Sequence, residues 1–480
     1  MTSMEKLLNK KGPLMSNELS SLIEKVENIN YNTASQRVAR NKKILKIKGY
    51  FVSNLSLCYL EKHIEDGLLF DSLNKAMFEN GKKYWYTLNA LELHGGIINQ
   101  KFLECYTNYP IIALKGHLPF KKIIQKFIKS DILNYNSEYY YISPKLKRTN
   151  FNSLTYKTIE AIKENILTDF GTLNKNIGLI SYNTAEKYAE FGKFRWAFKG
   201  VSNITGLMQG SKPGFVLADI LIGTSINEKD VLFFIEKIKH IQSFNNASRI
   251  IPFLIVDDLS KEALIALKYH GIAVGLIKEL FGQKYAETLK ELISILNNAG
   301  ASLKSSPEKY LDLIKELKKY NEGLANNIRG ALFEFVVGHI HSLDSNSSID
   351  LGREIYENDS RHEMDVLAIY NDRIVIAECK AKRSMINLET IDKWLGEKVP
   401  AFKKWIEKQE TWKKKNIEFE FWSTGGFTDD ALEKLENISK SASKYKVSYF
   451  EPNDIRNKAL SMKNKKLKEA LDDFFLKAKV

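Results

Sequence analysis

The chain has 480 residues, with 72 Lys and Arg against 58 Asp and Glu and a formal net charge of +14. Hydrophobic residues make up 44% and charged residues 27%, which are globular proportions and exclude a wholly disordered or fibrous chain. At about 150 residues per domain, this length predicts roughly three domains. The positive balance favours a polyanionic partner, either nucleic acid or an anionic membrane surface.

The positive charge is concentrated at the N-terminal end. Residues 1–150 hold 23 Lys and Arg against 13 Asp and Glu, a net charge of +10. Residues 151–300 and 301–480 each carry a net charge of only +2. This distribution predicts that the first third holds a polyanion while the remainder has another task. The alternative is that the surface lysines serve only solubility.

The cysteines and the N-terminal residues indicate the cellular compartment in which the protein is expected. Cys58, Cys105 and Cys379 form no CxxC motif and no Cys/His cluster, so neither a disulfide framework nor a zinc site is indicated. The first residues lack the apolar core of a signal peptide, and no apolar run approaches the roughly 18 residues of a membrane span. We expect a soluble, cytoplasmic protein with no membrane partner.

Residues 1–62 predict a small helical unit followed by a β-hairpin. Gly12-Pro13 ends a first helix, a second follows, and a third begins at Asn30 or Asn32. The next segment alternates like two strands around Gly49. This order resembles a winged helix-turn-helix, in which the third helix enters the major groove and Arg or Gln reads base edges. The resemblance implies DNA contacts from Gln36, Arg37, Arg40, Lys42 and Lys43, with protein contacts as the alternative.

Residues 63–150 predict a second unit of the same order. Helices over Tyr86–Leu93, Asn99–Tyr106 and Pro119–Ser130 precede a hairpin over 132–142. Tandem winged helices would lengthen the DNA footprint, whereas a spacer or a dimerisation unit is the alternative. The third helix carries the basic candidates for DNA binding, namely Lys121, Lys122 and Lys126.

The last third, residues 301–480, contains a hairpin that ends on charged residues. Met364–Tyr370 and Ile374–Ala381 predict two strands joined by a turn at Asn371-Asp372-Arg373. The run from Ile374 to Ala377 is continuously apolar, which is typical of a buried strand. A charge pair appended to a buried strand needs a chemical reason.

Three charges of this hairpin are expected to converge. Strand alternation places Glu378 and Lys380 on one face, and Asp365 begins the partner strand. Glu363 is expected to point to the other face of that strand and could be a competing or accessory acid. Two neighbouring carboxylates repel each other unless a cation joins them. Oxygen ligands suit a hard ion such as Mg²⁺, with Mn²⁺ as a substitute. Lys380 could orient a water or neutralise developing negative charge.

This pattern resembles the D…ExK signature of the PD-(D/E)xK nuclease superfamily, with Met364 in place of the signature proline. The resemblance implies a restriction-endonuclease-like mixed sheet and Asp365, Glu378 and Lys380 as catalytic residues. It also implies that a helix over Asn326–His341 supplies Glu334 as a further metal ligand beside Asp365 and Glu378. Lys382 extends the basic side of this site and is a candidate contact to the DNA backbone.

Residues 151–300 alternate strand and helix patterns, which predicts a middle α/β domain with some parallel sheet. Asp219 and the segment Glu236–Lys239 invite comparison with the nuclease motif. The comparison fails because Ile238 occupies the place of the lysine and the segment has a helical period. A regulatory or spacer module is therefore favoured over a degenerate nuclease-like domain. Asn297–Ser302 is the expected linker to the nuclease domain.

These patterns together predict a multidomain α/β and α+β protein: tandem winged helices, a middle α/β domain and a C-terminal nuclease domain. The predicted function is Mg²⁺-dependent DNA cleavage in restriction or anti-phage defence, since type IIS restriction enzymes also separate reading from cutting. The alternatives are a DNA-binding regulator or defence-complex subunit with an inactive nuclease-like domain, or a nuclease acting on RNA or junctions. The expected partners are double-stranded DNA, a second copy for double-strand cleavage and a further defence-system subunit.

Overall fold

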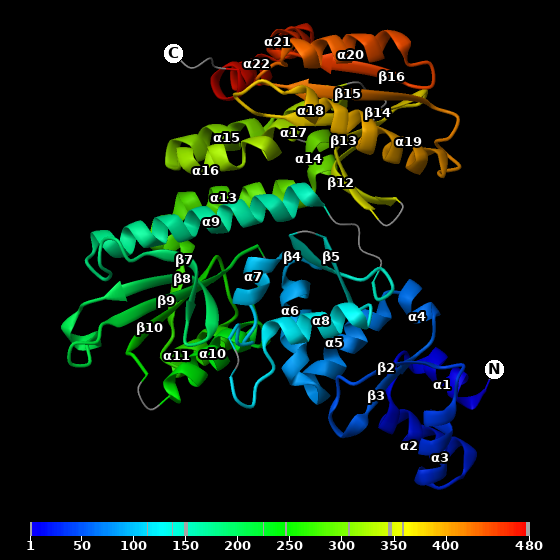
Figure 1. Ribbon diagram of the computed structural model, residues 1–480, viewed down its shortest axis with the longest axis vertical. Helices are drawn as coiled ribbons and strands as arrows, with labels where there is room; N and C mark the ends of the chain where they lie inside the picture. The colour runs from blue at the N-terminus through cyan, green and yellow to red at the C-terminus, as the bar shows by residue number, and fades with distance from the viewer. Residues whose placement is uncertain are drawn as a thin grey trace. The chain divides into compact units, whose positions relative to one another are not determined.

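The structure is a computed structural model that describes residues 2–112, 114–136, 138–147, 152–223, 225–244, 247–305, 308–343, 348–357 and 360–476. It is a multidomain α/β protein with mixed sheets and many helices (Figure 1). The chain divides into two compact units, 1–149 with 171–275 and 150–170 with 276–480. Among the described helices, none has both the length and the apolar character that crossing a membrane requires.

The first unit begins with three helices and a small antiparallel sheet, in the order expected from the sequence. The elements are α1 (Ser3–Lys11), β1 (Leu14–Met15), α2 (Ser16–Glu27), α3 (Tyr31–Arg40), β2 (Leu45–Lys48) and β3 (Ser56–Tyr59), with strand order β1-β3-β2. Asn30 caps α3 by accepting the Thr33 N–H. Ala34 and Val38 are buried in a core with Leu19. Helix α3 therefore turns its polar positions to solvent.

The same α-β-α-α-β-β order recurs once. After α4 (Lys62–Glu65) and α5 (Leu68–Asn80) come α6 (Lys82–Leu93), β4 (Ile97–Asn99), α7 (Gln100–Cys105), α8 (Phe120–Lys129), β5 (Leu133–Asn136) and β6 (Tyr139–Ile142), with strand order β4-β6-β5. Helix α8 is amphipathic, because Phe120, Ile123, Ile124 and Phe127 are all buried. Its lysines follow the opposite face.

A five-stranded sheet completes the first unit. Its strands are β7 (Glu186–Phe191), β8 (Phe194–Ser202), β9 (Gly214–Leu221), β10 (Ile250–Val256) and β11 (Ala273–Leu276), in the order β11-β10-β9-β8-β7. Strands β7, β8 and β9 are antiparallel, and β9 and β10 are parallel. Helices α10 (Leu232–Gln242) and α11 (Lys261–Tyr269) connect the later strands. The sequence predicted the parallel part but missed β7 and β8.

Helices lead into the C-terminal sheet of the second unit. They are α9 (Ser153–Asn176), α12 (Ile277–Phe281), α13 (Gln283–Asn297), α14 (Ala299–Ser305), α15 (Lys309–Tyr320), α16 (Glu322–Asn327) and α17 (Arg329–Ser342). The linker expected at Asn297–Ser302 is wrong, because α14 is a packed helix in which Ala299 is buried. A Cβ on Gly300 would lie 2.5 Å from the Ile349 carbonyl oxygen, so the small residues permit close packing rather than a flexible connection. The predicted four-domain division stays a prediction.

The second unit contains a mixed five-stranded sheet. Its strands are β12 (Ser348–Glu357), β13 (Ser360–Ile369), β14 (Arg373–Lys380), β15 (Asn416–Ser423) and β16 (Lys446–Phe450), paired in chain order. The first three are antiparallel and the last three parallel. The helices that follow are α18 (Leu388–Lys393), a π-helical turn (Trp394–Lys398), α19 (Val399–Glu407), α20 (Asp429–Ser441), α21 (Pro452–Ser461), α22 (Lys465–Ala470) and a second π-helical turn (Leu471–Phe475). A mixed sheet was expected here.

Candidate functional site

Strands β13 and β14 bring the three charges of the D…ExK pattern together. Val366 lies opposite Ala377, which brings Asp365 level with Glu378 on the adjacent strand. Lys380 Nζ lies 2.6 Å from Glu378 Oε1 and 3.4 Å from Asp365 Oδ2. Both acids are 5% exposed. The convergence expected from strand alternation is therefore present.

The neighbouring charges shift the pKa values of Asp365 and Lys380. Burial raises the pKa of Asp365, but the ammonium groups of Lys380 and Lys398 outweigh burial and leave that pKa below its usual value. Asp365 Oδ2 also accepts the Cys379 N–H at 2.7 Å. Burial lowers the pKa of Lys380, but Asp365 and Glu378 raise it well above its usual range. Asp365 is consequently ionised and Lys380 positively charged at neutral pH.

Helix α17 supplies a third acid, Glu334, as expected. Its Oε2 is buried and has no hydrogen-bond partner among the described residues. Burial raises the pKa of Glu334 well above its usual range, and the neighbouring Asp365 and Glu363 carboxylates add to the effect. A buried carboxyl oxygen without a partner, beside two other acids, is an unfavourable arrangement unless a cation or a proton compensates it.

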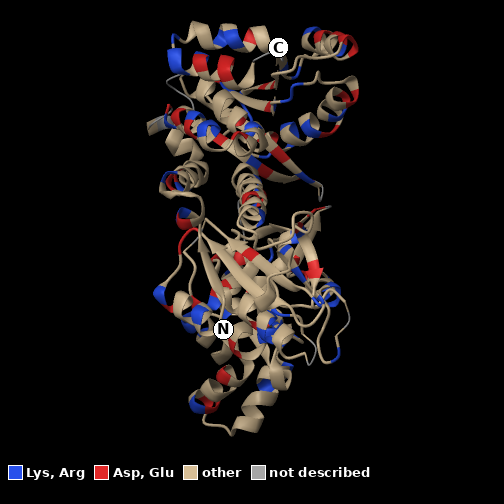
Figure 2. Ribbon diagram, turned by 90° about the vertical axis from the view of Figure 1, so that its left-hand side faces the viewer, with Lys and Arg blue, Asp and Glu red and all other residues tan. Residues whose placement is uncertain are grey.

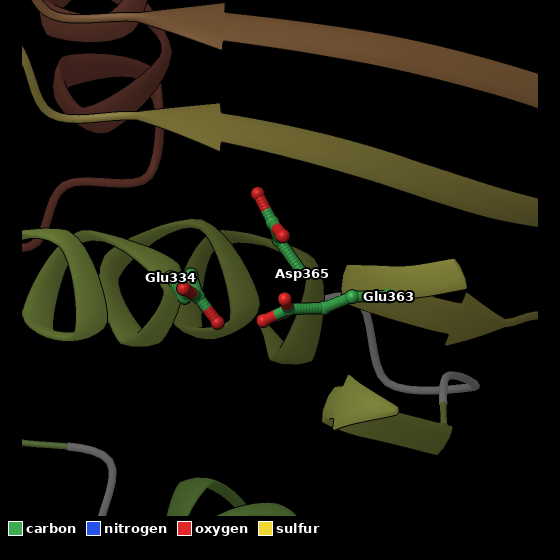
Figure 3. A group of neighbouring side chains, drawn as sticks. All are labelled: Glu334, Glu363 and Asp365. Carbon is green, nitrogen blue, oxygen red and sulfur yellow. The ribbon is translucent and has the colours of Figure 1, made fainter. Parts of the chain in front are cut away.

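Glu363 joins this group, and its expected position on the other strand face is wrong. Residues two apart in a strand share a face, so the period that placed Glu378 with Lys380 also places Glu363 with Asp365. One oxygen each from Glu334, Glu363 and Asp365 lie within 4.8 Å of one another. Figure 3 shows Glu334 on α17 and the two β13 acids directed toward a common space. We refer to these three residues as the acid cluster.

Glu378 is held differently from the acid cluster. Lys398, in the π-helical turn before α19, lies 2.7 Å from both Glu378 carboxylate oxygens. Burial lowers the pKa of Lys398, but Glu378 and Asp365 outweigh it and raise that pKa overall. Glu378 thus contacts two lysines, Lys380 and Lys398. Among the described residues, the carboxylate oxygens that lie within 4.8 Å of one another come from Glu334, Glu363 and Asp365, and Glu378 is not part of that group. Nothing in the local sequence marked Lys398, which lies 20 residues after Glu378.

The acid cluster fits a hard divalent cation. Its donors are all carboxylate oxygens, which suit Mg²⁺ or Mn²⁺ and not a soft thiolate-binding metal. The unpartnered Glu334 Oε2 is an oxygen that a metal could satisfy. Glu334, Glu363 and Asp365 are therefore the residues that could hold the ion, with Glu378 and Lys380 beside them.

Because Glu334 must lose its proton to bind a metal, metal affinity is expected to depend on pH. Burial and the neighbouring acids raise the pKa of Glu334 well above its usual range, so the apparent Mn²⁺ affinity should rise with pH until this carboxyl is ionised. Calorimetry in two buffers of different ionisation enthalpy would measure the released proton. In Glu334→Gln, proton release should fall by about one per ion; equal release from both proteins would contradict this role.

The candidate DNA-binding residues of the first helical unit are accessible. Gln36, Arg37 and Arg40 lie on α3, with Lys42 and Lys43 just beyond it, and all five are exposed. Arg37 also forms an ion pair with Glu27. Lys and Arg residues are interspersed with Asp and Glu along the ribbon as a whole (Figure 2).

The second set of candidates divides into two kinds. Lys121 and Lys122 are exposed on α8, and Lys382 is exposed just beyond β14. Lys126 departs from the prediction, because its ammonium donates to the Gly49 carbonyl and, at 2.8 Å, to the Tyr84 hydroxyl. It also lies over the Tyr84 ring. Lys126 therefore serves packing inside the first unit and is not a free phosphate contact.

The other five-stranded sheet contains a buried ion pair. Asp219 on β9 lies 2.6 Å from Lys237 on α10, and both side chains are fully buried. Asp219 accepts the Ala197 N–H at 2.8 Å, and Lys237 also donates to the carbonyls of Cys105 and Arg195. Burial raises the pKa of Asp219 to about 6, although Lys237 opposes the shift.

In both five-stranded sheets the strands pair in chain order, the first three are antiparallel, and the third and fourth are parallel, which allows the positions to be compared. Phe198 lies opposite Ala218 as Val366 lies opposite Ala377. When these two pairs are aligned, Asp219 takes the place of Glu378, and Ala197 and Leu221 take the places of Asp365 and Lys380. This sheet keeps one carboxylate of the pattern, closed by a lysine, and lacks the other two groups.

The chain was compared with protein-family models, with curated proteins and with solved structures. No known protein-family model matches the chain, and no curated protein matches its sequence. One solved structure, Can2 from Sulfobacillus thermosulfidooxidans in complex with cyclic tetra-adenylate, is similar over 48% of this chain and 81% of that chain. The sequence identity is 15% and the TM-score is 0.22, which are too low to support a functional argument.

Proposed function

We propose that the chain is a Mg²⁺-dependent DNA endonuclease of the PD-(D/E)xK type. The observation that carries this proposal is the acid cluster on α17 and β13, with Lys380 beside it at the end of β14. Within the acid cluster, Glu334 Oε2 is buried and has no hydrogen-bond partner among the described residues, and the Glu363 and Asp365 carboxylates lie beside it. A purely structural role does not account for the unpartnered Glu334 oxygen, because buried acids are normally paired or hydrogen-bonded.

Each residue has a distinct role in this proposal. Glu334, Glu363 and Asp365 would hold the ion, which when bound polarises the scissile phosphate and lowers the pKa of a coordinated water. Lys380, positively charged and adjacent to Asp365 and Glu378, orients the attacking water and neutralises charge that develops on the phosphate. Lys398 fixes the Glu378 carboxylate through both oxygens. Lys382 contacts the DNA backbone next to the site.

DNA reading is assigned to the N-terminal helical units. Their α-β-α-α-β-β order and the exposed Gln36, Arg37 and Arg40 on α3 support winged-helix docking in the major groove. A tethered reading module raises the effective concentration of the cutting site on bound DNA. One acid cluster cuts one strand, so double-strand cleavage requires a second copy or two events. Restriction or anti-phage defence, alone or with a further subunit, is the proposed setting.

Substitution of the α3 arginines tests the reading role. In Arg37→Ala/Arg40→Ala, duplex affinity should fall, and the slope of log K against log salt should flatten by about 2, since each lost phosphate contact removes nearly one unit. Fluorescence anisotropy at several salt concentrations measures both quantities. Lys440→Ala on α20 is the surface control. Affinity unchanged in the double variant would assign α3 to protein contacts instead.

The lysines that pair with the acids of the site favour a second function, that of a DNA-binding regulator. Lys157, Lys380 and Lys398 already pair with the acids of the site, so a DNA-binding regulator with a closed, inactive domain is the competing proposal. Incubation of the full chain with supercoiled plasmid, with Mg²⁺ or with EDTA, separates the two. Nicking that requires Mg²⁺ supports the endonuclease. Plasmid binding without nicking in either Mg²⁺ or Mn²⁺ supports the regulator.

A further inference from the structure

Two residues of helix α9 contact the acid cluster although they lie far from Glu363 in the sequence. The Ser153 hydroxyl donates to Glu363 Oε1, and the Lys157 ammonium donates to Glu363 Oε2. Residues four apart lie on the same side of a helix, so the first turn of α9 presents both groups to Glu363. Both oxygens of one acid in the cluster are therefore occupied by α9.

The first turn of α9 is fixed against strand β12. Asn152, which precedes Ser153, forms a bridge with Arg353 and donates to the Leu351 carbonyl at 2.9 Å. Gly352, at a φ of +61°, allows this contact, because a Cβ there would lie 2.7 Å from the Leu154 nitrogen. Ser153 is fully buried. The backbone that carries Lys157 is thus held in place by contacts outside the acid cluster.

The Lys157 side chain is accessible from solvent. It is 46% exposed, whereas Glu363 is 22% exposed, so solvent and a polyanion can reach the ammonium while the carboxylate faces the cluster. Its charge acts on more than one acid, since Lys157 also opposes the raised pKa of Glu334. The solvent-accessible Lys157 ammonium therefore supplies positive charge to Glu363, which a divalent ion bound by the acid cluster would also do.

We propose that Lys157 is a positioning residue that substitutes for the metal's charge on Glu363 until DNA is bound. This inference rests on the proposed function. A DNA phosphate near the site draws the Lys157 ammonium away from Glu363 and frees a carboxylate oxygen for the metal. DNA binding and metal binding then strengthen each other, and the two effects are equal because coupling between sites is reciprocal. Ser153 keeps the Glu363 carboxylate oriented after Lys157 has left.

Direct metal binding to the full chain tests the first half of the inference. Mn²⁺ affinity is measured by calorimetry without DNA for the wild type, Lys157→Met and Lys157→Arg. Lys157→Met should bind Mn²⁺ at least about fivefold more tightly, since a competing charge is gone, and Lys157→Arg should stay near the wild type. Lys408→Met, which removes a partner of Glu357 outside the cluster, should leave the affinity unchanged. Equal or weaker binding by Lys157→Met would overturn the inference.

The coupling is tested with a short duplex and Ca²⁺ as the ion, with a gel of the recovered DNA to verify that it is intact. The wild type should bind Ca²⁺ at least about fivefold more tightly when the duplex is present, and Lys157→Met should lose most of that gain. The same gain in both proteins would overturn the inference. If Mn²⁺ binds as expected but plasmid is never nicked, the endonuclease proposal fails while the metal-competing role of Lys157 stands. If nicking occurs with unchanged Mn²⁺ affinity in Lys157→Met, only the inference fails.

Discussion

Replacement of Lys380 by methionine should reduce Mg²⁺-dependent plasmid nicking by about 10³-fold, because loss of one group that stabilises transition-state charge typically has an effect of this size. The Lys380 ammonium contacts both Asp365 and Glu378, so it is placed where charge on a bound phosphate would develop. Asp365→Asn should cause a loss at least as large, because it removes a charge from the acid cluster while keeping an acceptor for the Cys379 N–H. Initial nicking rates under excess enzyme measure both variants.

A matched surface substitution shows whether such losses are specific. Lys440 on α20 is 76% exposed and forms an ion pair with the neighbouring Glu436, so Lys440→Met should nick at the wild-type rate. Duplex affinity should be nearly unchanged in Lys380→Met and Asp365→Asn, since the reading residues lie elsewhere. Retained nicking in both site variants would show that any cleavage comes from another site or from a contaminant.

Asp219→Asn should lower the free energy of unfolding of the first unit by about 3–5 kcal/mol, the usual effect of removing one partner of a buried ion pair. The substitution leaves the Lys237 ammonium fully buried with only neutral acceptors, the introduced side-chain amide and the carbonyls of Cys105 and Arg195. Urea titration followed by fluorescence should show an earlier first transition, because the chain has more than one folding unit. Nicking under conditions where the variant is folded should be unaffected.

The double variant Asp219→Leu/Lys237→Met distinguishes a buried charge pair from a functional site. Because apolar residues of similar volume can replace a buried pair at little cost, the double variant should be more stable than Asp219→Asn alone. Removing the exposed Lys440–Glu436 pair should change stability by no more than about 0.5 kcal/mol. A double variant as unstable as the sum of the two single variants would contradict this expectation, because additive effects mean that the two side chains are not energetically coupled.

Short-range patterns in the sequence predicted the hairpin at the centre of the site. The apolar run at Ile374–Ala377 and the spacing of two between Glu378 and Lys380 are properties of a single buried strand, and the structure places them as expected. The same period, applied to β13, places Glu363 beside Asp365. The position of Glu363 was therefore predictable from local sequence, although the prediction made for it was wrong.

Long-range contacts were beyond a single sequence. Ser153 and Lys157 reach Glu363 only because α9 docks on β12, and Lys398 reaches Glu378 only through a π-helical turn. Neither contact has a local signature. The prediction for Lys126 missed long-range contacts in the same way. Its helical face is basic in sequence, but its ammonium donates hydrogen bonds to the Gly49 carbonyl and the Tyr84 hydroxyl. Charge patterning identifies which side chains are polar but not which of them remain free.

The small residues of Asn297–Ser302 led to the wrong prediction of a linker. The segment around Ala299 and Gly300 has a composition typical of linkers, yet the absence of bulk there allows α14 to pack closely on β12. In the first five-stranded sheet, β7 and β8 were missed, and with them the shared topology of the two sheets. That topology is what relates Asp219 to Glu378 and shows which groups the first sheet lacks.

The most direct measurement is a crystal structure of the full chain grown or soaked with Mn²⁺, with anomalous scattering used to locate the ion. The account predicts a peak within about 2.0–2.3 Å of carboxylate oxygens from Glu334 and Asp365, with Glu363 as a further ligand and Lys157 displaced from it. No peak at the acid cluster at saturating Mn²⁺, with Lys157 still bound to Glu363, would contradict the account. A peak confined to carboxylates elsewhere on the chain would contradict it equally.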